Sequence, residues 1–256
     1  MDLISALILG IVEGISEFLP ISSTGHLILA SQLLSLSQTN FLKSFEIIIQ
    51  LGAILSVVVL YWKSFLNINL LKRLFVAFLP TGIIGLALYN IIKTYLLGSQ
   101  AVVLWALAVG GVRIIVFELM HKEHESDHES VPLMVSYKHS FLIGLFQAIA
   151  IIPGTSRSAA TIIGGLLLGL KRKTIVEFSF LLAVPTMLAA TGLDLIKNAS
   201  SFSTDQIGAL SVGFVVSFVV ALLSIKFLLR YVRNHSFIAF GVYRIALAVL
   251  FWLIVF

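Results

Sequence analysis

Residues 7–26 read Leu-Ile-Leu-Gly-Ile-Val-Glu-Gly-Ile-Ser-Glu-Phe-Leu-Pro-Ile-Ser-Ser-Thr-Gly-His. The stretch begins as an apolar helix and is then interrupted by two glutamates, a proline, three consecutive hydroxyl side chains, a glycine and a histidine. A proline followed by small and hydroxyl residues ends a helix. At membrane depth, broken backbone persists only where it is buried in protein or lines a wet cavity. The segment 3–34 therefore predicts a re-entrant hairpin, in which two short helices are joined by a loop.

The composition places this hairpin in a membrane protein. Hydrophobic residues make up 59% of the 256 residues and charged residues only 11%, against roughly 25% in soluble chains. This excludes a soluble enzyme and a disordered chain, and the absence of cysteine excludes disulfides and thiolate chemistry. The net charge of +5 indicates basic cytoplasmic loops and not a nucleic-acid partner. The sequence thus predicts an all-α polytopic membrane protein in contact with membrane lipids.

Six segments are long and apolar enough to cross a bilayer, which takes about 20 residues. They are 44–62, 74–92, 101–119, 175–196, 207–229 and 237–256. A second interrupted stretch, 140–170, contains Pro153, Gly154 and Arg157 and predicts a second re-entrant hairpin. The histidine-rich and acidic segment 121–139 is typical of a solvated cytoplasmic loop, not of a metal site.

The two interrupted stretches are related to each other. Residues 7–14 align with 141–148 at an offset of 134, and after a one-residue slip residues 20–24 align with 153–157. The chain is therefore predicted to be a duplication of residues 1–120 and 140–256. Each half has one hairpin and three transmembrane helices. Because a hairpin returns to its own side, three crossings place the two halves in inverted topology.

The basic residues predict which side faces the cytoplasm. If both termini lie outside, the inner loops carry eleven Lys or Arg residues and the outer loops three. The inner set is Lys63, Lys72, Arg73, Lys122, Lys138, Lys171, Arg172, Lys173, Lys226, Arg230 and Arg233, and the outer set is Lys43, Lys93 and Lys197. The two hairpins then enter from opposite sides, and their loops are expected to meet near the midplane.

The first hairpin carries the densest group of chemically active side chains. Glu13 and Glu17 share one helix face, where two carboxylates repel each other unless one is protonated or a cation lies between them. Oxygen ligands of this kind suit Mg²⁺ or Ca²⁺. Ser23 and His26 are three residues apart and could form an activated nucleophile pair, although this spacing alone is a weak signal.

The second hairpin has the composition of an anion site. Glycine and hydroxyl residues precede an apolar helix, and Arg157 adds a planar fork that suits phosphate. Arg157 could also be the buried ion partner of Glu13 or Glu17. The predicted phosphate-binding residues of the two hairpins are Ser22, Thr24, Gly25, Gly154, Thr155, Ser156 and Ser158.

Other polar residues inside the spans are expected to have supporting roles. Arg113 and Arg244 suit a structural ion pair or a side chain that reaches toward the membrane surface. Glu46 lies one turn before Gln50 on the same helix face, and both could support a polar cavity or cap a helix.

Residues 13–26 and the run Pro-Gly-Thr-Ser-Arg-Ser at 153–158 resemble the two signature motifs of the undecaprenyl-diphosphate phosphatase (bacitracin-resistance protein) family. The resemblance extends to residues 45–52, 164–170, 178–182 and 235–237. It departs from the family at Ala159, where glycine is common.

The resemblance implies that undecaprenyl diphosphate is hydrolysed to the monophosphate and inorganic phosphate. This recycles the lipid carrier for peptidoglycan and confers bacitracin resistance. It also implies a bacterial plasma membrane, an active site open to the extracytoplasmic side, and a need for Mg²⁺ or Ca²⁺. The family's important residues fall on Glu13, Glu17, Ser23, His26 and Arg157, and the oligomeric state stays open, a homodimer included.

Residues and resemblance together give a mechanistic hypothesis. Glu13 and Glu17 hold the cation, Arg157 binds the phosphate, and Ser23 attacks with His26 as its base, or His26 activates a water. The polyprenyl tail lies in an apolar groove between spans. The alternative is a transporter or flippase of polyprenyl phosphate, since carriers also use inverted repeats. A single intramembrane histidine beside paired glutamates argues against an acid-phosphatase-like lipid phosphatase.

Overall fold

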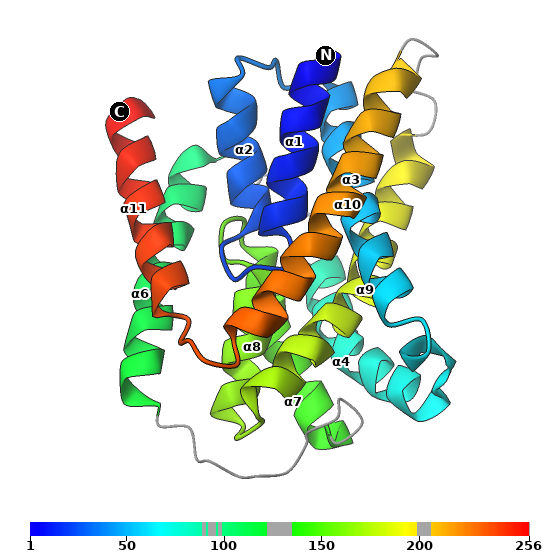
Figure 1. Ribbon diagram of the computed structural model, residues 1–256, viewed down its shortest axis with the longest axis vertical. Coiled ribbons are helices and arrows are strands. Elements are labelled where there is room, and N and C mark those ends of the chain that lie inside the picture. The colour runs from blue at the N-terminus through cyan, green and yellow to red at the C-terminus, as the bar shows by residue number, and fades with distance from the viewer. Residues whose placement is uncertain (89–90, 92–95, 97–98, 122–134, 199–205, 256) are drawn as a thin grey trace.

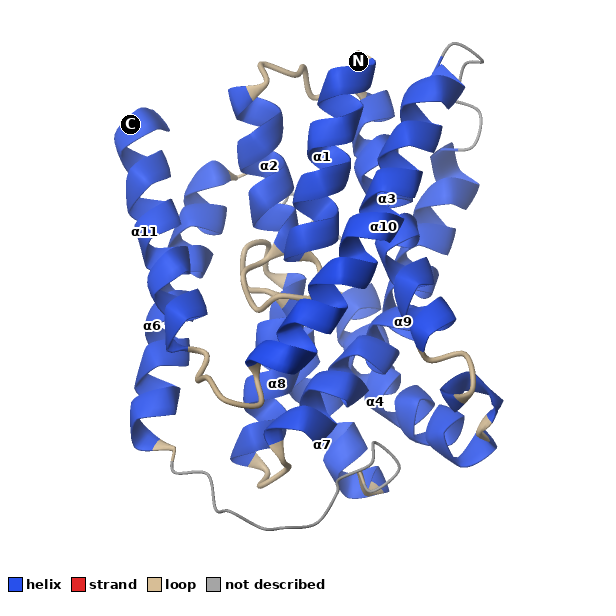
Figure 2. Ribbon diagram, in the orientation of Figure 1, coloured by secondary structure: helices blue, strands red, loops and turns tan. Residues whose placement is uncertain are grey.

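The chain is helical throughout the part that the structure describes. The computed structural model describes residues 1–88, 91, 96, 99–121, 135–198 and 206–255, and within these ranges it has no strand (Figure 2). The helices are α1 (Leu3–Ser16), α2 (Ser23–Leu33), α3 (Asn40–Leu60), α4 (Ile68–Ala87), α6 (Gln100–Met120), α7 (Tyr137–Ala148), α8 (Arg157–Leu167), α9 (Arg172–Asn198), α10 (Ile207–Tyr231) and α11 (Ile238–Val255). Short 3₁₀ helices occupy Ser64–Leu66 and Ile149–Ile151.

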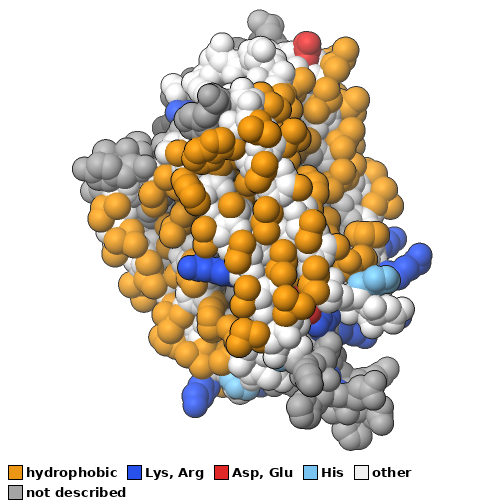
Figure 3. Space-filling model, turned by 90° about the vertical axis from the view of Figure 1, so that its left-hand side faces the viewer, with side chains coloured by type: hydrophobic (Ala, Val, Ile, Leu, Met, Phe, Trp, Pro, Cys, Tyr) orange, Lys and Arg blue, Asp and Glu red, His pale blue; other side chains and the backbone are white. Residues whose placement is uncertain are grey.

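Five of these helices, α3, α4, α6, α9 and α10, are long and apolar enough to cross a membrane. They overlap five of the six predicted spans, although α4 begins at Ile68 and so precedes the predicted span 74–92, and the sixth, α11, is apolar but just shorter. Large apolar side chains face outward along them, as the mostly hydrophobic surface on the side of α6 and α11 shows (Figure 3). A solvated surface would not carry so wide an apolar patch. The prediction of a multi-pass membrane protein is confirmed.

Both interrupted segments contain a pair of short helices. In Figure 1, α1 and α2 extend from the end of the molecule that carries both termini, whereas α7 and α8 extend from the opposite end. The connections of both pairs lie near the middle of the molecule. We call residues 17–22 the first loop and residues 152–156 the second loop. The predicted loop 121–139 falls mainly on residues 122–134, which lie outside the described part of the chain.

The two loops end in the same unusual cap. Ser22 and Ser156 precede α2 and α8 with φ of 75° and 76°, a left-handed conformation that is uncommon for serine. Each side chain accepts a hydrogen bond from the backbone N–H three residues on, at Gly25 and Ala159. These caps are 134 residues apart, so the structure pairs Ser22 with Ser156. The predicted alignment of Pro20 with Pro153 has an offset of 133, so the prolines and the serine caps do not share one offset.

Each helix pair packs mainly against a long helix from the other half of the chain. α1 packs against α10, and α7 packs against α4. Small residues allow the close approach, which is how membrane helices associate when lipid removes the hydrophobic drive. A Cβ added at Gly10 of α1 would lie 2.8 Å from the Gly213 carbonyl oxygen. One at Gly144 of α7 would lie 2.1 Å from the Ala77 carbonyl oxygen. Backbone contact thus fixes α1 on α10 and α7 on α4.

We expect Gly144→Ala to lower the unfolding free energy in detergent by about 1–3 kcal/mol, because the new methyl group forces α7 away from the α4 backbone. Thermal unfolding measures the effect. Gly192→Ala is the matched control, since a Cβ at that position meets nothing within 4 Å. Equal melting temperatures for the two variants would contradict the close packing of α4 and α7.

Candidate functional site

A cavity of about 760 Å³ lies where the two loops meet. The α2 end of the first loop contributes Ser22, Ser23 and Thr24. The second loop and α8 contribute Gly154, Ser156 and Arg157. Because α2 and α8 both begin at this wall, two helix N-termini converge on one space. Free N–H groups and the positive ends of helix dipoles favour anions there.

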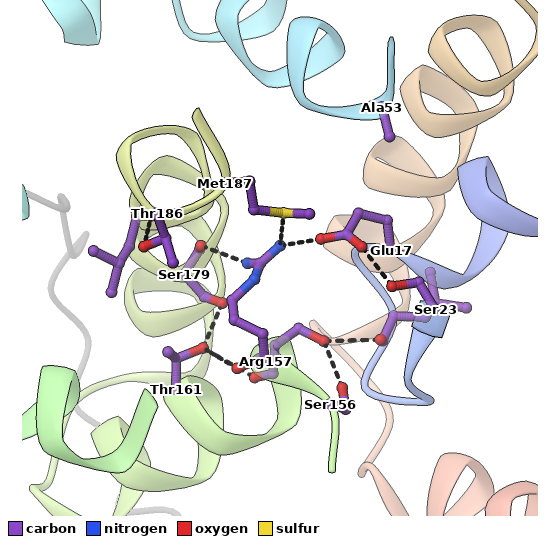
Figure 4. Close-up of polar contacts among 12 residues, drawn as sticks. Glu17, Ser23, Ala53, Ser156, Arg157, Thr161, Ser179, Thr186 and Met187 are labelled. Carbon is purple, nitrogen blue, oxygen red and sulfur yellow. Dashed lines mark hydrogen bonds and ion pairs between the residues drawn. The ribbon is translucent and has the colours of Figure 1, made fainter. Parts of the chain in front are cut away.

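Arg157 is the first residue of α8 and crosses the gap between the two loops. Its Nη2 donates to Glu17 Oε1 at 2.7 Å, and its Nη1 donates to the Ser179 carbonyl oxygen at 2.9 Å (Figure 4). The centroid of the Phe18 ring lies 5.8 Å from the guanidinium carbon of Arg157. Since both side chains of the ion pair are largely buried, the charges are held in a setting of low dielectric. The structure thus brings together Arg157 and Glu17, which are 140 residues apart in sequence.

The Glu17 carboxylate is shared between Arg157 and Ser23. Ser23 Oγ donates to Glu17 Oε2 at 2.5 Å, at the short end of the range for a charge-assisted hydrogen bond. In Figure 4, Glu17 lies between the arginine and the serine. A hydroxyl that donates to a fixed carboxylate has a proton acceptor already in place.

His26 does not pair with Ser23, so the expected Ser23–His26 pair is wrong in this structure. Its Nδ1 lies 2.7 Å from the Ser22 carbonyl oxygen, and its Nε2 lies 2.8 Å from the Tyr243 hydroxyl. A carbonyl only accepts, so Nδ1 carries a proton, and in the neutral ring Nε2 accepts from Tyr243. The imidazole ring also lies nearly parallel to the Tyr243 ring, with 5.5 Å between the two ring centroids. His26 is absent from the described residues that line the cavity.

Glu13 lies one turn before Glu17 on α1 and is completely buried. Neither of its carboxylate oxygens accepts a hydrogen bond from the described residues, and the Glu17 carboxylate lies close enough to interact with it. An ionised carboxylate without a partner is costly to bury, so this position suits a bound cation or a proton. No group of three or more acidic or histidine side chains that could hold a metal occurs in the described ranges. A cation at Glu13 would therefore need oxygen ligands from a substrate or from water.

Four of the seven predicted phosphate-binding residues line the cavity, namely Ser22, Thr24, Gly154 and Ser156. The other three lie behind its wall. The Gly25 N–H donates to the Ser22 hydroxyl that caps α2, and the Thr155 carbonyl oxygen accepts from Arg244. Ser158 Oγ donates to the Leu19 carbonyl oxygen at 2.8 Å and so ties α8 to the first loop.

Two residues of α11 contact the hairpins: Tyr243, which was not predicted as a site residue, and Arg244, which was expected to form an ion pair or to reach the membrane surface. Tyr243 binds His26, and Arg244 bonds only to backbone carbonyl oxygens in the described part of the chain. The expectation of an ion pair or a surface-seeking side chain at Arg244 is therefore wrong. The predicted span 237–256 contains Arg244 but no acidic residue that could pair with it, and this was the signal in the sequence.

A polar group from α4, α7 and α9 forms another part of the cavity wall. Gln147 Nε2 donates to Thr81 Oγ1 at 2.9 Å and to Thr186 Oγ1 at 3.1 Å. All three residues line the cavity, as does Gln50. The predicted alignment of residues 7–14 with 141–148 matches Gln147 to Glu13, and that match was the signal in the sequence.

Comparisons with known proteins agree over the whole chain. Three relatives named undecaprenyl-diphosphatase are 56% identical over 253 residues (Sulfurihydrogenibium sp. strain YO3AOP1), 54% over 256 (Persephonella marina) and 50% over 250 (Aquifex aeolicus). The alignments cover 99%, 100% and 96% of this chain, and the same shares of the three relatives. The family model for bacitracin resistance protein BacA matches residues 6–250. The chain therefore belongs to the bacitracin resistance protein BacA family.

Proposed function

We propose that the protein is an integral membrane phosphatase that hydrolyses undecaprenyl diphosphate to undecaprenyl phosphate and inorganic phosphate. This reaction recycles the lipid carrier for cell-wall synthesis and confers bacitracin resistance. The observation that carries the proposal is the Glu17 carboxylate, held between the Arg157 guanidinium and the Ser23 hydroxyl at a cavity where two helix N-termini meet. The names of the full-length relatives support it.

Phosphate binding follows from the charges around the cavity. The N-termini of α2 and α8 present backbone N–H groups, and Arg157 presents a guanidinium whose Nη2 is directed at Glu17. A diphosphate carries enough negative charge to interact with both helix ends and the guanidinium together. Phosphoryl transfer depends mainly on such positioning and charge neutralisation.

The attack is assigned to Ser23. Its oxygen forms a bond to the terminal phosphorus, its proton passes to Glu17 Oε2, and the bond from phosphorus to the bridging oxygen breaks. Lipid monophosphate leaves, and water then hydrolyses the phosphoserine to release inorganic phosphate and restore the hydroxyl. Glu17 replaces His26 as the proposed base, because Ser23 already donates to it at 2.5 Å. The competing route is a water activated by the same carboxylate.

A divalent cation, Mg²⁺ or Ca²⁺, fits beside Glu13. The fit rests on the two buried carboxylate oxygens of Glu13 that accept no hydrogen bond in the described part of the chain. Glu13 and Glu17 would hold the ion together with phosphate oxygens, as Mg²⁺ is commonly held by one or two carboxylates and a substrate. When bound, the ion supplies charge neutralisation at the diphosphate.

We expect Glu13→Gln to raise the Mg²⁺ concentration needed for half-maximal phosphate release by at least about tenfold, since a charged oxygen ligand is lost. Activity titrated with Mg²⁺ measures the shift. The matched control is Glu46→Gln, because Glu46 is a partly buried acid that already accepts a hydrogen bond from Ser31. Identical titration curves for the wild type and Glu13→Gln would remove Glu13 from the cation site.

The lipid tail is proposed to leave the cavity between α4 and α9. The residues that line the cavity there have small side chains, namely Gly82 and Gly85 on α4 and Ala189 and Ala190 on α9. A polyprenyl chain needs such an apolar path to remain in the hydrocarbon region while its diphosphate reaches Arg157.

We expect Gly85→Leu to raise KM for lipid diphosphates about tenfold while kcat stays within about twofold, a loss of ~1.4 kcal/mol of binding. Steady-state kinetics with farnesyl diphosphate measures both constants. Gly192→Leu on α9 is the control, since its Cβ position is open. An unchanged KM in Gly85→Leu would place the tail elsewhere.

The membrane arrangement is proposed to consist of two inverted repeats, each with one re-entrant hairpin and three crossings. The matching caps at Ser22 and Ser156 and the exchanged packing of α1 on α10 and α7 on α4 support it. In the described part of the chain, the connections between α3 and α4 and between α8 and α9, with the starts of α4 and α9, carry many of the basic residues and lie at the end of the molecule away from the termini (Figure 1), so that end would face the cytoplasm of a bacterial plasma membrane. The substrate cavity would then open to the extracytoplasmic side.

Phosphate release from undecaprenyl diphosphate by the purified wild type, with and without a chelator, tests the function. We expect release that the chelator abolishes and that added Mg²⁺ or Ca²⁺ restores. Movement of lipid phosphate between leaflets of a vesicle without hydrolysis would favour the carrier alternative and contradict the phosphatase.

A further inference from the structure

Arg244 on α11 is completely buried, with 0% of its surface exposed. In the described ranges it has no carboxylate partner, and the ion pairs there involve Arg157 and Arg172 instead. All five N–H groups of its guanidinium donate to backbone carbonyl oxygens. An arginine used in this way satisfies its own donors completely while fixing the position of every peptide that it touches.

Three of the five carbonyls belong to the two loops of the site. Nη1 donates to Pro20 in the first loop at 3.3 Å and to Thr155 in the second loop at 3.0 Å. Nη2 donates to Gly154 at 2.9 Å. One planar group therefore joins loops that are more than 130 residues apart in sequence.

The two remaining bonds attach this group to α6. Nη2 donates to the Ala106 carbonyl oxygen at 3.0 Å, and Nε donates to that of Leu107 at 3.3 Å. α6 packs chiefly against α11, beside the loops in Figure 1. The helix pair thus acts as a fixed support from which Arg244 reaches the loops.

The carbonyl contacts also set the direction of backbone donors. In a trans peptide the C=O and the next N–H point in opposite directions. Holding the Thr155 carbonyl toward Arg244 turns the Ser156 N–H away from Arg244, and Ser156 lines the cavity. Ser156 has φ of 76°, a conformation that a non-glycine residue keeps only where the surroundings enforce it, whereas Gly154 adopts its φ of 91° without strain.

Gly110 provides the space for the guanidinium. A Cβ added there would lie 2.2 Å from Arg244 Nη2 and 2.8 Å from its Cζ. This glycine allows a substitution that displaces the guanidinium without removing its charge.

We propose that Arg244 is a positioning residue of the phosphatase. It sets the separation of the two loops and thereby the alignment of Ser23 and Glu17 with Arg157. The rate readout of this proposal rests on the function proposed above, whereas its loop readout does not.

Gly110→Ala is the principal test. Alanine is the better helix former, so the change does not weaken α6 by itself, but the methyl group collides with the guanidinium. We expect kcat for farnesyl diphosphate to fall about 100-fold, the cost of a small misalignment, with KM within about threefold. Backbone hydrogen exchange in residues 18–22 and 152–156 should become faster. Gly208→Ala, whose Cβ meets only a Leu3 methyl at 3.9 Å, should behave as the wild type.

Arg244→Lys is the second variant, because an ammonium keeps the charge but cannot span the carbonyls of both loops. We expect the same split between kcat and KM and the same faster exchange. If this variant fails to fold, Gly110→Ala alone decides.

The proposal is overturned if Gly110→Ala keeps kcat within threefold of the wild type, or loses kcat without faster exchange in the loops. If the wild type releases no phosphate, the proposed function fails, and loop exchange in Gly110→Ala still decides whether Arg244 positions the loops.

Discussion

Ser23→Ala is expected to lower kcat for lipid diphosphate hydrolysis by at least about 10⁴-fold, since loss of an attacking hydroxyl leaves only binding and charge stabilisation. The expectation rests on position and on contact. Ser23 lines the cavity at the start of α2, and its hydroxyl already donates to the Glu17 carboxylate at 2.5 Å. In the structure no rearrangement is needed before the proton can move.

Phosphate release measures the effect under saturating substrate, and a rapid-quench search for a phosphorylated wild-type protein supplies an independent readout. Ser56→Ala is the matched control. Ser56 is also a buried serine on a helix, but its hydroxyl donates to the Ala53 carbonyl oxygen outside the cavity. Near-normal turnover of Ser23→Ala would eliminate the serine attack and leave a water activated by Glu17 as the route.

The helical fold was largely predictable from the sequence, because lipid imposes simple rules on backbone and side chains. Apolar length predicted the long helices, and the proline and hydroxyl runs predicted both breaks. The exchange of packing partners between the halves was not predictable. It depends on backbone contacts at Gly10 and Gly144, whose small size is visible in the sequence while their partners on α10 and α4 are not.

The chemical character of the site residues was more predictable from the sequence than the contacts between them. Ion pairing of Arg157 with a glutamate of the first hairpin followed from charge alone, and the structure selects Glu17 over Glu13. The base for Ser23 could not be predicted, because residue spacing does not tell where a side chain turns. His26 shares a helix with Ser23, yet its ring turns to Tyr243 on α11. Contacts that cross from a distant helix carry no local signal.

Arg157→Lys is expected to lower kcat about 10³-fold, an effect of the size seen when a transition-state donor is lost. The Arg157 guanidinium donates two hydrogen bonds in different directions, from Nη1 to the Ser179 carbonyl oxygen and from Nη2 to Glu17 Oε1. A lysine keeps the charge, but its compact head cannot hold both contacts and a phosphate oxygen as a planar fork does. The variant therefore separates geometry from charge.

Steady-state kinetics of Arg157→Lys should show the loss mainly in kcat, because the tail groove between α4 and α9 is untouched. Arg172→Lys is a suitable control. Arg172 forms a buried two-point ion pair with Glu118, with bonds of 2.5 and 3.2 Å, away from the residues that line the cavity. That variant should lose stability but little kcat. If Arg157→Lys stays within about tenfold of the wild type, positive charge alone would suffice at this position, and the fork would not be the feature that stabilises the transferring phosphoryl group.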